Sequence, residues 1–225
     1  MKNVSVLIPY RQDCGPRDQA FYWVKRFYEK FLPEVEICIG ECDTELFSRS
    51  QAINNASKKA TGEIFVIADS DLFYDPKIIN EAINLLEKFE WIVPYYRIHY
   101  IGEESTKRIL GLKPEWPMNK NLDIWTLDAT KNITVGGLSI LPKRNFEMVR
   151  GFDERFCGWG GEDEAFESAV NTLCGQYERI NTDIYHLWHP RLNGNPHYQE
   201  NLTLHGRYRA AAGNKDEIQK LINER

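Results

Sequence analysis

Three consecutive carboxylates, Glu162, Asp163 and Glu164, follow a glycine-rich turn that also carries an indole, Trp159. Adjacent like charges repel one another and glycine loses chain entropy when it is ordered, so several local sequence rules are broken in one place. A helix that begins at Glu162 explains the acids, because carboxylates are favoured near a helix N-terminus. It does not explain the tryptophan. We interpret the run as a functional site in which a carboxylate could accept a proton.

A second pair of carboxylates, Asp69 and Asp71, ends an apolar run of strand length from Glu63 to Ala68. Such a run is typical of a buried parallel strand, and carboxylates at its carboxyl end project toward the crevice where open α/β sheets bind ligands. Their oxygens suit Mg²⁺ or Mn²⁺, which commonly bridge carboxylates to substrate phosphates. The alternative is a turn in which one of the two caps a helix that begins near Pro76.

Two histidines three residues apart, His186 and His189, lie in a segment that we expect to be extended or turning. Imidazoles at this spacing can converge on one ion, although a single histidine is more often packed or solvent-facing. Since Asp69 and Asp71 could complete a set of nitrogen and oxygen ligands, we expect at least one of the histidines at a metal site.

Apolar strands alternate with helical patterns through the first 95 residues, which predicts an α/β fold with a parallel-rich sheet covered by helices. Residues 96–132 show weak periodicity, and we interpret them as an irregular insertion that faces a second substrate or as a solvated excursion. Two further helices are expected after residue 195. The expected strands are Val4 to Pro9, Glu36 to Gly40, Glu63 to Ala68 and Trp91 to Tyr95, and the expected helices are Asp18 to Phe31, Ser48 to Ala60, Pro76 to Phe89 and Glu162 to Cys174.

Composition is that of a soluble globular protein of 225 residues, with a net charge of −5. A chain of this length buries about 70% of its unfolded surface, so one domain needs no disulfide or metal for stability. The five cysteines are odd in number and show no paired spacing, which predicts reduced thiols in the cytoplasm. The chain opens directly into a strand, and on that ground we expect neither a signal peptide nor stable membrane insertion. The acidic charge argues against nucleic acid as a partner.

Short motifs along the chain together resemble the β-1,4-galactosyltransferase family and, more loosely, the catalytic domains of chondroitin polymerases and polypeptide N-acetylgalactosaminyltransferases. The resemblance covers residues 3–190 and implies the GT-A fold, an α/β domain with a mixed, mostly parallel central sheet. It also implies one domain over residues 1–225, with a nucleotide-binding half (about 1–95), an acceptor-binding and catalytic half (about 96–195) and a helical tail (about 196–225). The motifs are Ile8-Pro9-Tyr10-Arg11, Phe47-Ser48-Arg49, Asp69-Ser70-Asp71, Gly136-Gly137 and Trp159-Gly160-Gly161-Glu162-Asp163.

The same resemblance implies a role for each matching residue. Asp163 takes the place of the catalytic base, and Glu162 and Asp163 that of the acceptor-binding pair. The metal ligands fall on Asp71, His186 and His189, with His186 where the family has a methionine. The residues that match the donor-binding positions are Pro9, Tyr10, Arg11, Phe47, Arg49, Asp69, Gly137 and Trp159.

The sequence therefore predicts a metal-dependent, inverting glycosyltransferase that uses Mn²⁺ or Mg²⁺ and a nucleotide-sugar donor, which we expect to be a UDP-sugar. The acceptor is a carbohydrate or another hydroxyl-bearing molecule. Thr134 stands where the family often has an aromatic residue against the donor sugar, so the donor need not be UDP-galactose. Two alternatives stay open: a nucleotidyltransferase that makes nucleotide sugars, and a catalytically silent sugar-binding module on the same fold.

Overall fold

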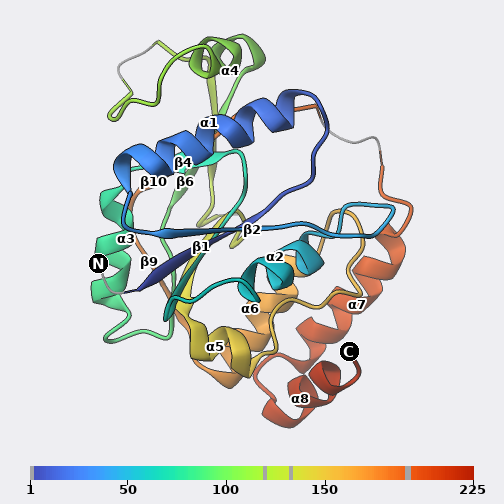
Figure 1. Cartoon of the computed structure of the whole chain (residues 1–225). Helices are drawn as coiled ribbons and strands as arrows, with labels where there is room; N and C mark the ends of the chain where they lie inside the picture. The colour runs from blue at the N-terminus through green and yellow to red at the C-terminus, as the bar shows by residue number, and fades with distance from the viewer. Residues whose placement is uncertain (1–2, 119–120, 132–133, 191–193) are drawn as a thin grey trace.

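The computed structural model describes residues 3–118, 121–131, 134–190 and 194–225 (Figure 1). Its central six-stranded sheet has the order β2-β1-β3-β8-β5-β9. Their apolar runs predicted the first three strands in chain order. The side chains of β1 and β3 are buried on both faces, and most of those of β2 are partly buried. The strands are β1 (Val4–Pro9), β2 (Glu36–Gly40), β3 (Ile64–Ala68), β5 (Trp91–Val93), β8 (Leu138–Pro142) and β9 (Tyr177–Arg179).

Parallel and antiparallel pairs share the central sheet. β1 pairs in parallel with β2 and β3, and β5 pairs in parallel with β9, whereas β8 runs antiparallel to β3 and β5. The carboxyl ends of β1, β2 and β3 consequently meet at one edge of the sheet, where Asp69 follows β3 directly. The expected mixed α/β fold is confirmed.

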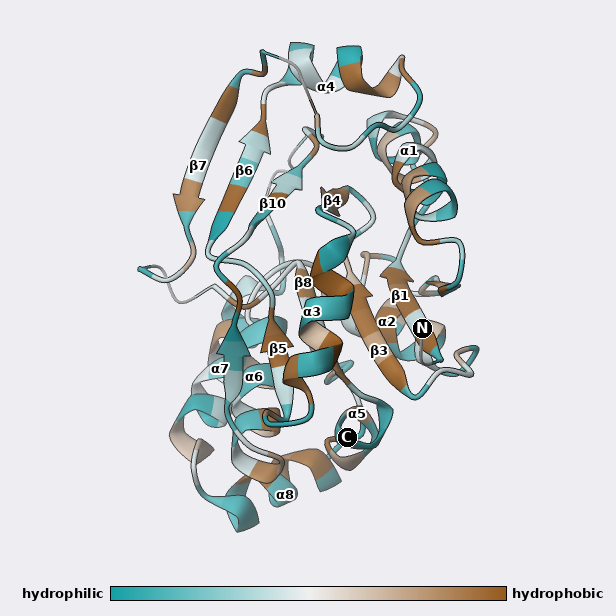
Figure 2. Ribbon diagram, turned by 90° about the vertical axis from the view of Figure 1, so that its left-hand side faces the viewer, coloured by the Kyte–Doolittle hydropathy of each residue, from teal (hydrophilic) through white to brown (hydrophobic). Residues whose placement is uncertain are grey.

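A second sheet of four strands has the order β4-β10-β6-β7. Figure 2 shows β10, β6 and β7 side by side in the upper half of the molecule, apart from β1, β3 and β8 below. β10 lies between two strands that come much earlier in the chain, since it pairs with β4 on one side and with β6 on the other. The strands are β4 (Leu72–Tyr74), β6 (Arg97–Ile101), β7 (Ile124–Asp128) and β10 (Asp183–His186).

Helices cover both sides of the central sheet, with α1 on one side and α2 and α6 on the other in Figure 1. Most aromatic residues of α1 are buried, although Tyr22 is exposed, and Phe27 and Trp23 pack against Phe73 of β4. The two C-terminal helices pack on α6, and Tyr208 donates a hydrogen bond of 2.9 Å to the buried Asp153. The helices are α1 (Pro16–Phe31), α2 (Arg49–Ser57), α3 (Lys77–Leu85), α4 (Glu103–Leu110), α5 (Lys143–Met148), α6 (Glu162–Leu173), α7 (Tyr198–Ala211) and α8 (Lys215–Asn223).

The expectation of an irregular segment over residues 96–132 is wrong for its described part, which contains β6, α4 and β7. The charged residues of α4 are placed as the helix dipole favours, with Glu103 and Glu104 in the first turn and Lys107 in the last. Weak hydrophobic periodicity misled the prediction because β7 is an edge strand with mostly exposed side chains. The expected contact of this segment with a second substrate stays a prediction.

Candidate functional site

Arg49 links two carboxylates that lie far apart in the sequence. Its Nε donates to Asp69 Oδ1 over 2.7 Å, and its Nη1 donates to Asp163 Oδ1 over 2.6 Å. Arg49 begins α2, and Ser48 caps this helix by accepting a hydrogen bond from the Gln51 backbone. Burial and both carboxylates act on the guanidinium, and the net effect raises the pKa of Arg49 above its usual value. The arginine therefore stays charged and holds the two acids together.

The first turn of α6 presents Asp163 to Arg49. Gly161 precedes the helix with a φ of 91°, a left-handed conformation that glycine adopts without steric cost. A β-bridge between Ser48 and Gly158 ties the loop before α2 to the glycine-rich loop before α6. Burial raises the pKa of Asp163 to about 7 against the opposing effect of Arg49, with a further raising effect from neighbouring carboxylates. A carboxylate with this pKa can accept and release a proton near neutral pH.

Glu162 lies beside Asp163 but points to a different partner. Its side chain is buried, and its Oε2 accepts a hydrogen bond of 3.0 Å from the backbone N–H of Gly160. Burial raises the pKa of Glu162, and Arg49 opposes that effect. The two neighbouring acids thus have distinct surroundings, which permits distinct roles.

A turn at Gly136 and Gly137 lies against Asp69 and Asp163. The Asp69 N–H donates to the Gly137 carbonyl over 2.9 Å, and Gly137 has a φ of 87°. A Cβ on Gly136 would lie 2.2 Å from Asp163 Oδ2, a distance that no real Cβ contact tolerates. The absence of a side chain at Gly136 therefore sets how closely the backbone approaches the Asp163 carboxylate.

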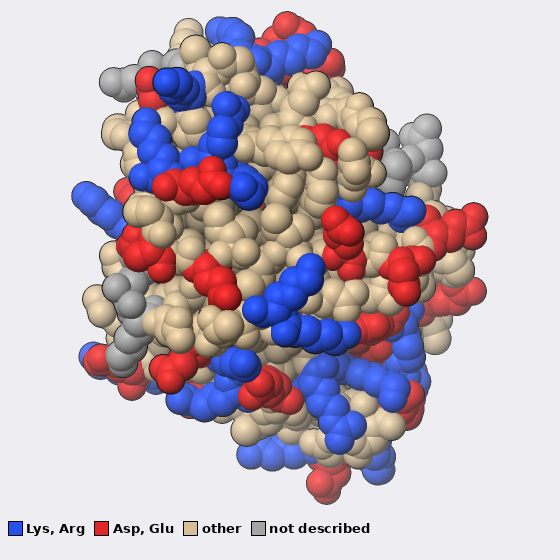
Figure 3. Space-filling view, in the orientation of Figure 1, with Lys and Arg blue, Asp and Glu red and all other residues tan. Residues whose placement is uncertain are grey.

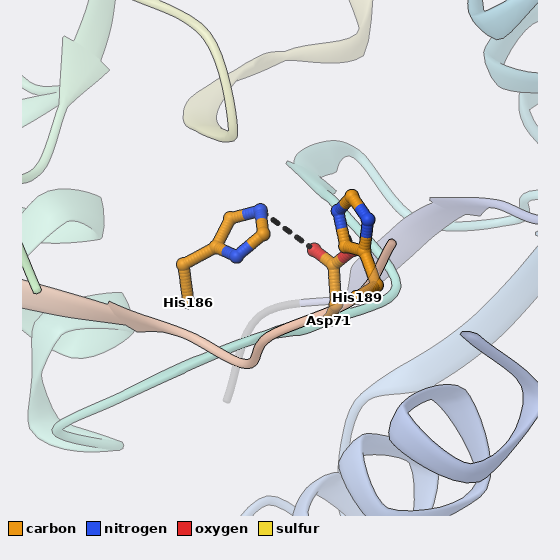
Figure 4. A group of neighbouring side chains, drawn as sticks. All are labelled: Asp71, His186 and His189. Carbon is orange, nitrogen blue, oxygen red and sulfur yellow. Dashed lines mark ion pairs between the residues drawn. The ribbon is translucent and has the colours of Figure 1, made fainter. Parts of the chain in front are cut away.

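Asp71, His186 and His189 form a cluster whose nearest ligand atoms all lie within 4.8 Å of one another. Asp71 Oδ1 lies 3.5 Å from His186 Nε2, and Asp71 Oδ2 lies 3.4 Å from His189 Nε2. Figure 4 shows both imidazole rings beside the Asp71 carboxylate. Asp71 is only 5% exposed, and its Oδ1 has no hydrogen-bond partner among the described residues. Buried polar atoms are rarely left unpartnered, so these three side chains fit a divalent cation.

Burial lowers the pKa of His189, with Asp71 as the principal opposing influence. A neutral imidazole is the form that binds metal. The alternative in which Asp69 or Asp71 caps α3 is wrong, because α3 follows Pro76 without a side-chain cap. Instead the backbone carbonyl of Asp71 accepts a 2.9 Å hydrogen bond from Leu187, which fixes β10 beside the aspartate.

The other residues matched to donor binding are more widely spread. Pro9 and Tyr10 are buried, and the Tyr10 hydroxyl donates to Asp18 over 2.9 Å, whereas Arg11 is exposed and Phe47 is half-buried. Trp159 is 77% exposed. The structure thus brings Arg49, Asp69, Gly137 and Asp163 into one cluster. No hydrogen bond or ion pair among the described residues joins that cluster to Arg11, Phe47 or Trp159.

Two residues that the sequence did not single out support the Gly136 turn. The buried Tyr95 hydroxyl donates to the Gly136 carbonyl, and Arg179 donates to the carbonyls of Tyr95 and Thr134 over 3.0 and 2.8 Å. The Arg179 guanidinium also lies 5.2 Å from the Tyr177 ring centroid. Nothing in the local sequence signals these contacts, because Tyr95 and Gly136 are 41 positions apart.

The described surface carries no single-sign patch on the face in Figure 3, where lysine and arginine side chains alternate with aspartate and glutamate. Such a face offers no broad cationic track for a nucleic-acid backbone. A hollow of about 580 Å³ lies along α4, away from both carboxylate clusters, and its lining residues are Lys107, Arg108, Ile109, Gly111, Leu112, Asn121 and Leu122.

Comparisons with known proteins show which families this chain is similar to. Residues 117–191 match the family model described as the N-terminal domain of galactosyltransferase, and residues 37–146 match glycosyl transferase family 2. The chain has a GT-A fold and resembles the β-1,4-galactosyltransferases. No helix of the described residues is long and apolar enough to cross a membrane.

Individual relatives agree with that class. β-1,4-Galactosyltransferase 4 of Cricetulus griseus is 22% identical over 207 residues, which cover 87% of this chain and 51% of the relative, and the Rattus norvegicus protein gives the same values. The chain thus spans about half the length of these curated relatives.

Two solved structures share the fold. Drosophila β-1,4-galactosyltransferase 7, as a variant in complex with manganese, UDP-Gal and xylobiose, matches with a TM-score of 0.58 and 15% identity over 90% of this chain and 79% of that one. TarS of S. aureus in complex with UDP-GlcNAc matches with a TM-score of 0.59 and 14% identity over 100% of this chain and 71% of that one.

Proposed function

We propose that this protein is a metal-dependent, inverting glycosyltransferase that moves a sugar from a UDP-sugar to an acceptor hydroxyl. The observation that carries the proposal is the Arg49 bridge, which places a proton-accepting carboxylate, Asp163, beside Asp69. Asp69 lies two residues before Asp71 of the metal cluster. The proposed base and the proposed metal site are thus linked through Asp69, and a single displacement needs both, on opposite sides of the anomeric carbon.

Asp71, His186 and His189 are the residues that would hold the cation, and Mn²⁺ suits their mixed nitrogen and oxygen donors better than Mg²⁺ does. When bound, a divalent cation offsets the negative charge that builds up on the departing nucleoside diphosphate. Manganese in complex with the Drosophila relative supports the same choice. Asp71 Oδ1, which has no hydrogen-bond partner among the described residues, supports a cation at this site.

Asp163 is the proposed general base. The acceptor oxygen bonds to the anomeric carbon as the bond from that carbon to the phosphate oxygen breaks, and the acceptor proton passes to the carboxylate. Arg49 occupies Oδ1, and Oδ2 lies at the Gly136 turn. A pKa of about 7 makes the carboxylate a suitable acceptor at neutral pH. Glu162, held by the Gly160 backbone, is the proposed ligand of acceptor hydroxyl groups.

The nucleotide half of the proposed domain covers residues 1–95 and the acceptor half residues 96–195, with a helical tail after them. The donor contacts that we propose lie where strands β1 and β3 end, at the start of α2, in the turn before β8 and in the loop before α6. They are Pro9, Tyr10, Arg11, Phe47, Arg49, Asp69, Gly137 and Trp159. UDP-sugars in both structural neighbours support a UDP-sugar donor. The cytoplasmic location expected from the sequence stays a prediction.

Release of free UDP from a panel of UDP-sugars, measured with and without Mn²⁺, tests the proposal against both alternatives. A glycosyltransferase releases UDP in a metal-dependent reaction that an acceptor accelerates. A nucleotidyltransferase would instead release pyrophosphate from a nucleoside triphosphate, and a silent sugar-binding module would release neither. Inversion of the anomeric configuration, read by proton NMR of the product, tests the single displacement. Retention would refute it.

A further inference from the structure

A row of aromatic side chains extends from the proposed metal site across the second sheet. His186 pairs with Tyr100 in the register of β10 and β6, and Tyr100 pairs with Trp125 in that of β6 and β7. Residues directly opposite one another on neighbouring strands share a face of the sheet. The rings follow one another at centroid distances of 5.2 Å from His189 to His186, 5.1 Å from His186 to Tyr100, and 5.0 Å from Tyr100 to Trp125.

This face of the sheet adjoins the carboxylate cluster. On the inner side of His186 its register partner is Leu72, and a Cβ on Gly137 would lie 3.0 Å from Leu72 Cδ1 and 3.9 Å from Asp69 Oδ2. The row thus begins beside the Gly137 turn and ends on the outermost strand, β7. The end of the row is two strand spacings from β10, about 10 Å.

Exposure increases along the row. The side chain of His186 is 21% exposed and Tyr100 is half-buried, whereas Trp125 is 59% exposed. On the opposite face of the same strands the aromatic side chains pack inside the protein, since Tyr185 contacts Phe73 and Trp116. The face that carries the metal cluster therefore has an exposed indole, Trp125, in continuity with the site.

We infer that Tyr100 and Trp125 form a binding platform for sugar rings of an extended carbohydrate acceptor. This inference rests on the proposed function. Flat, amphipathic rings give ligands a large apolar contact at low conformational cost, and the C–H face of a pyranose ring is suited to such a contact. The proposed nucleotide contacts lie at the ends of β1 and β3, so the second sheet is left for the acceptor.

In this arrangement Tyr100 and Trp125 contact the acceptor sugar rings that lie beyond the ring carrying the reacting hydroxyl. Acceptors with several sugar rings would reach both aromatic side chains, and a single sugar would not. The protein should therefore prefer oligosaccharide acceptors over monosaccharides. The side chains of β6 and β7, rather than Glu162 and Asp163, would set this preference.

The test measures binding of xylobiose, cellobiose, chitobiose and lactose, and of the longer homologues of the first three, to the full chain loaded with UDP and Mn²⁺. Titration calorimetry is done on the wild type and on Trp125→Ala, Trp125→Phe and Ile124→Ala. Ile124 is the matched control, because it lies next to Trp125 on β7 and points to the opposite face. It is 37% exposed.

We expect at least one of these oligosaccharides to bind the wild type, and Trp125→Ala to weaken that binding about five- to tenfold. Trp125→Phe keeps an aromatic face and should retain most of the affinity, and Ile124→Ala should leave it unchanged. UDP affinity should stay the same in all four proteins.

Equal oligosaccharide affinity of the wild type and Trp125→Ala would overturn the inference, as would binding of UDP but of no oligosaccharide. Weaker UDP binding by Trp125→Ala would also overturn it, because the row would then contact the donor. Failure of the wild type to bind UDP with Mn²⁺ would instead refute the proposed function.

Discussion

Replacement of Gly136 by alanine tests whether the approach of the backbone to Asp163 sets the geometry of catalysis. An alanine Cβ at this position would lie 2.2 Å from Asp163 Oδ2, whereas ordinary contact begins at 3.4 Å. The carboxylate must therefore move by the difference, about 1.2 Å, or the turn must shift by as much. Movement of the carboxylate disturbs the 2.6 Å hydrogen bond between Arg49 and Asp163, and movement of the turn displaces the Gly137 carbonyl that accepts from Asp69.

A misplacement of about 1 Å can cost roughly 10²-fold in rate when the reacting groups are otherwise positioned. We expect Gly136→Ala to lower kcat for sugar transfer by about that factor. The metal cluster does not include Gly136, so Mn²⁺-dependent UDP binding should change little. The assay is initial-rate release of UDP at saturating donor and acceptor, with UDP affinity measured separately by calorimetry.

Gly206 offers a matched control, because it lies within α7 and a Cβ there would meet nothing within 4 Å. Gly206→Ala should keep full activity and stabilise the fold by about 0.5–1 kcal/mol, since alanine loses less chain entropy than glycine in a helix. Thermal unfolding of both variants separates misplacement of the base from loss of the fold. Wild-type kcat in a folded Gly136→Ala protein would refute the reasoning.

Three further predictions concern the two carboxylate clusters. Asp163→Asn should lower the rate of sugar transfer by about 10²- to 10⁴-fold with donor binding retained. Glu162→Gln should mainly raise the KM for the acceptor. Equal, modest losses for both variants in steady-state kinetics would contradict both roles. Asp71→Asn and His189→Ala should abolish Mn²⁺-dependent UDP-sugar binding in calorimetry without loss of the fold, and normal binding by Asp71→Asn would show that the metal site is elsewhere. The pH profile of kcat/KM should rise through about 7, because the raised pKa keeps Asp163 protonated and unable to act as a base below that pH. Since Arg49 lowers that pKa, Arg49→Gln should move this rise to higher pH, and an unmoved profile would assign it to another group.

The parts of this site that could be predicted are those in which residue type carries the chemistry. Asp71, His186 and His189 are natural ligands, and their expected convergence agrees with the cluster in the structure. The strands that end at Pro9 and Ala68 followed from continuous apolar runs. The strands and the paired histidines are local signals, whereas the convergence of Asp71 with the histidines was expected from ligand chemistry and from the family resemblance.

Contacts between distant segments could not be predicted in the same way. Arg49 and Asp163 are 114 positions apart, and no local pattern tells an arginine which acids it will bridge. The place of β10 between β4 and β6 depends on pairing across more than 80 residues, which neither hydrophobic periodicity nor turn residues encode. The aromatic row likewise depends on strand pairing, since Tyr100 is opposite His186 of β10 and Trp125 of β7.

The short segment from Asp69 to Asp71 joins the two clusters mechanically. The Asp69 backbone is held by the Gly137 carbonyl of the first sheet, and the Asp71 carbonyl is held by Leu187 at the end of β10 in the second. A movement between the two sheets would change the position of the proposed metal ligands relative to the proposed base, which Arg49 ties to Asp69. Since a base and a leaving group must lie on opposite sides of one carbon, the distance between the sheets is itself part of the catalytic geometry.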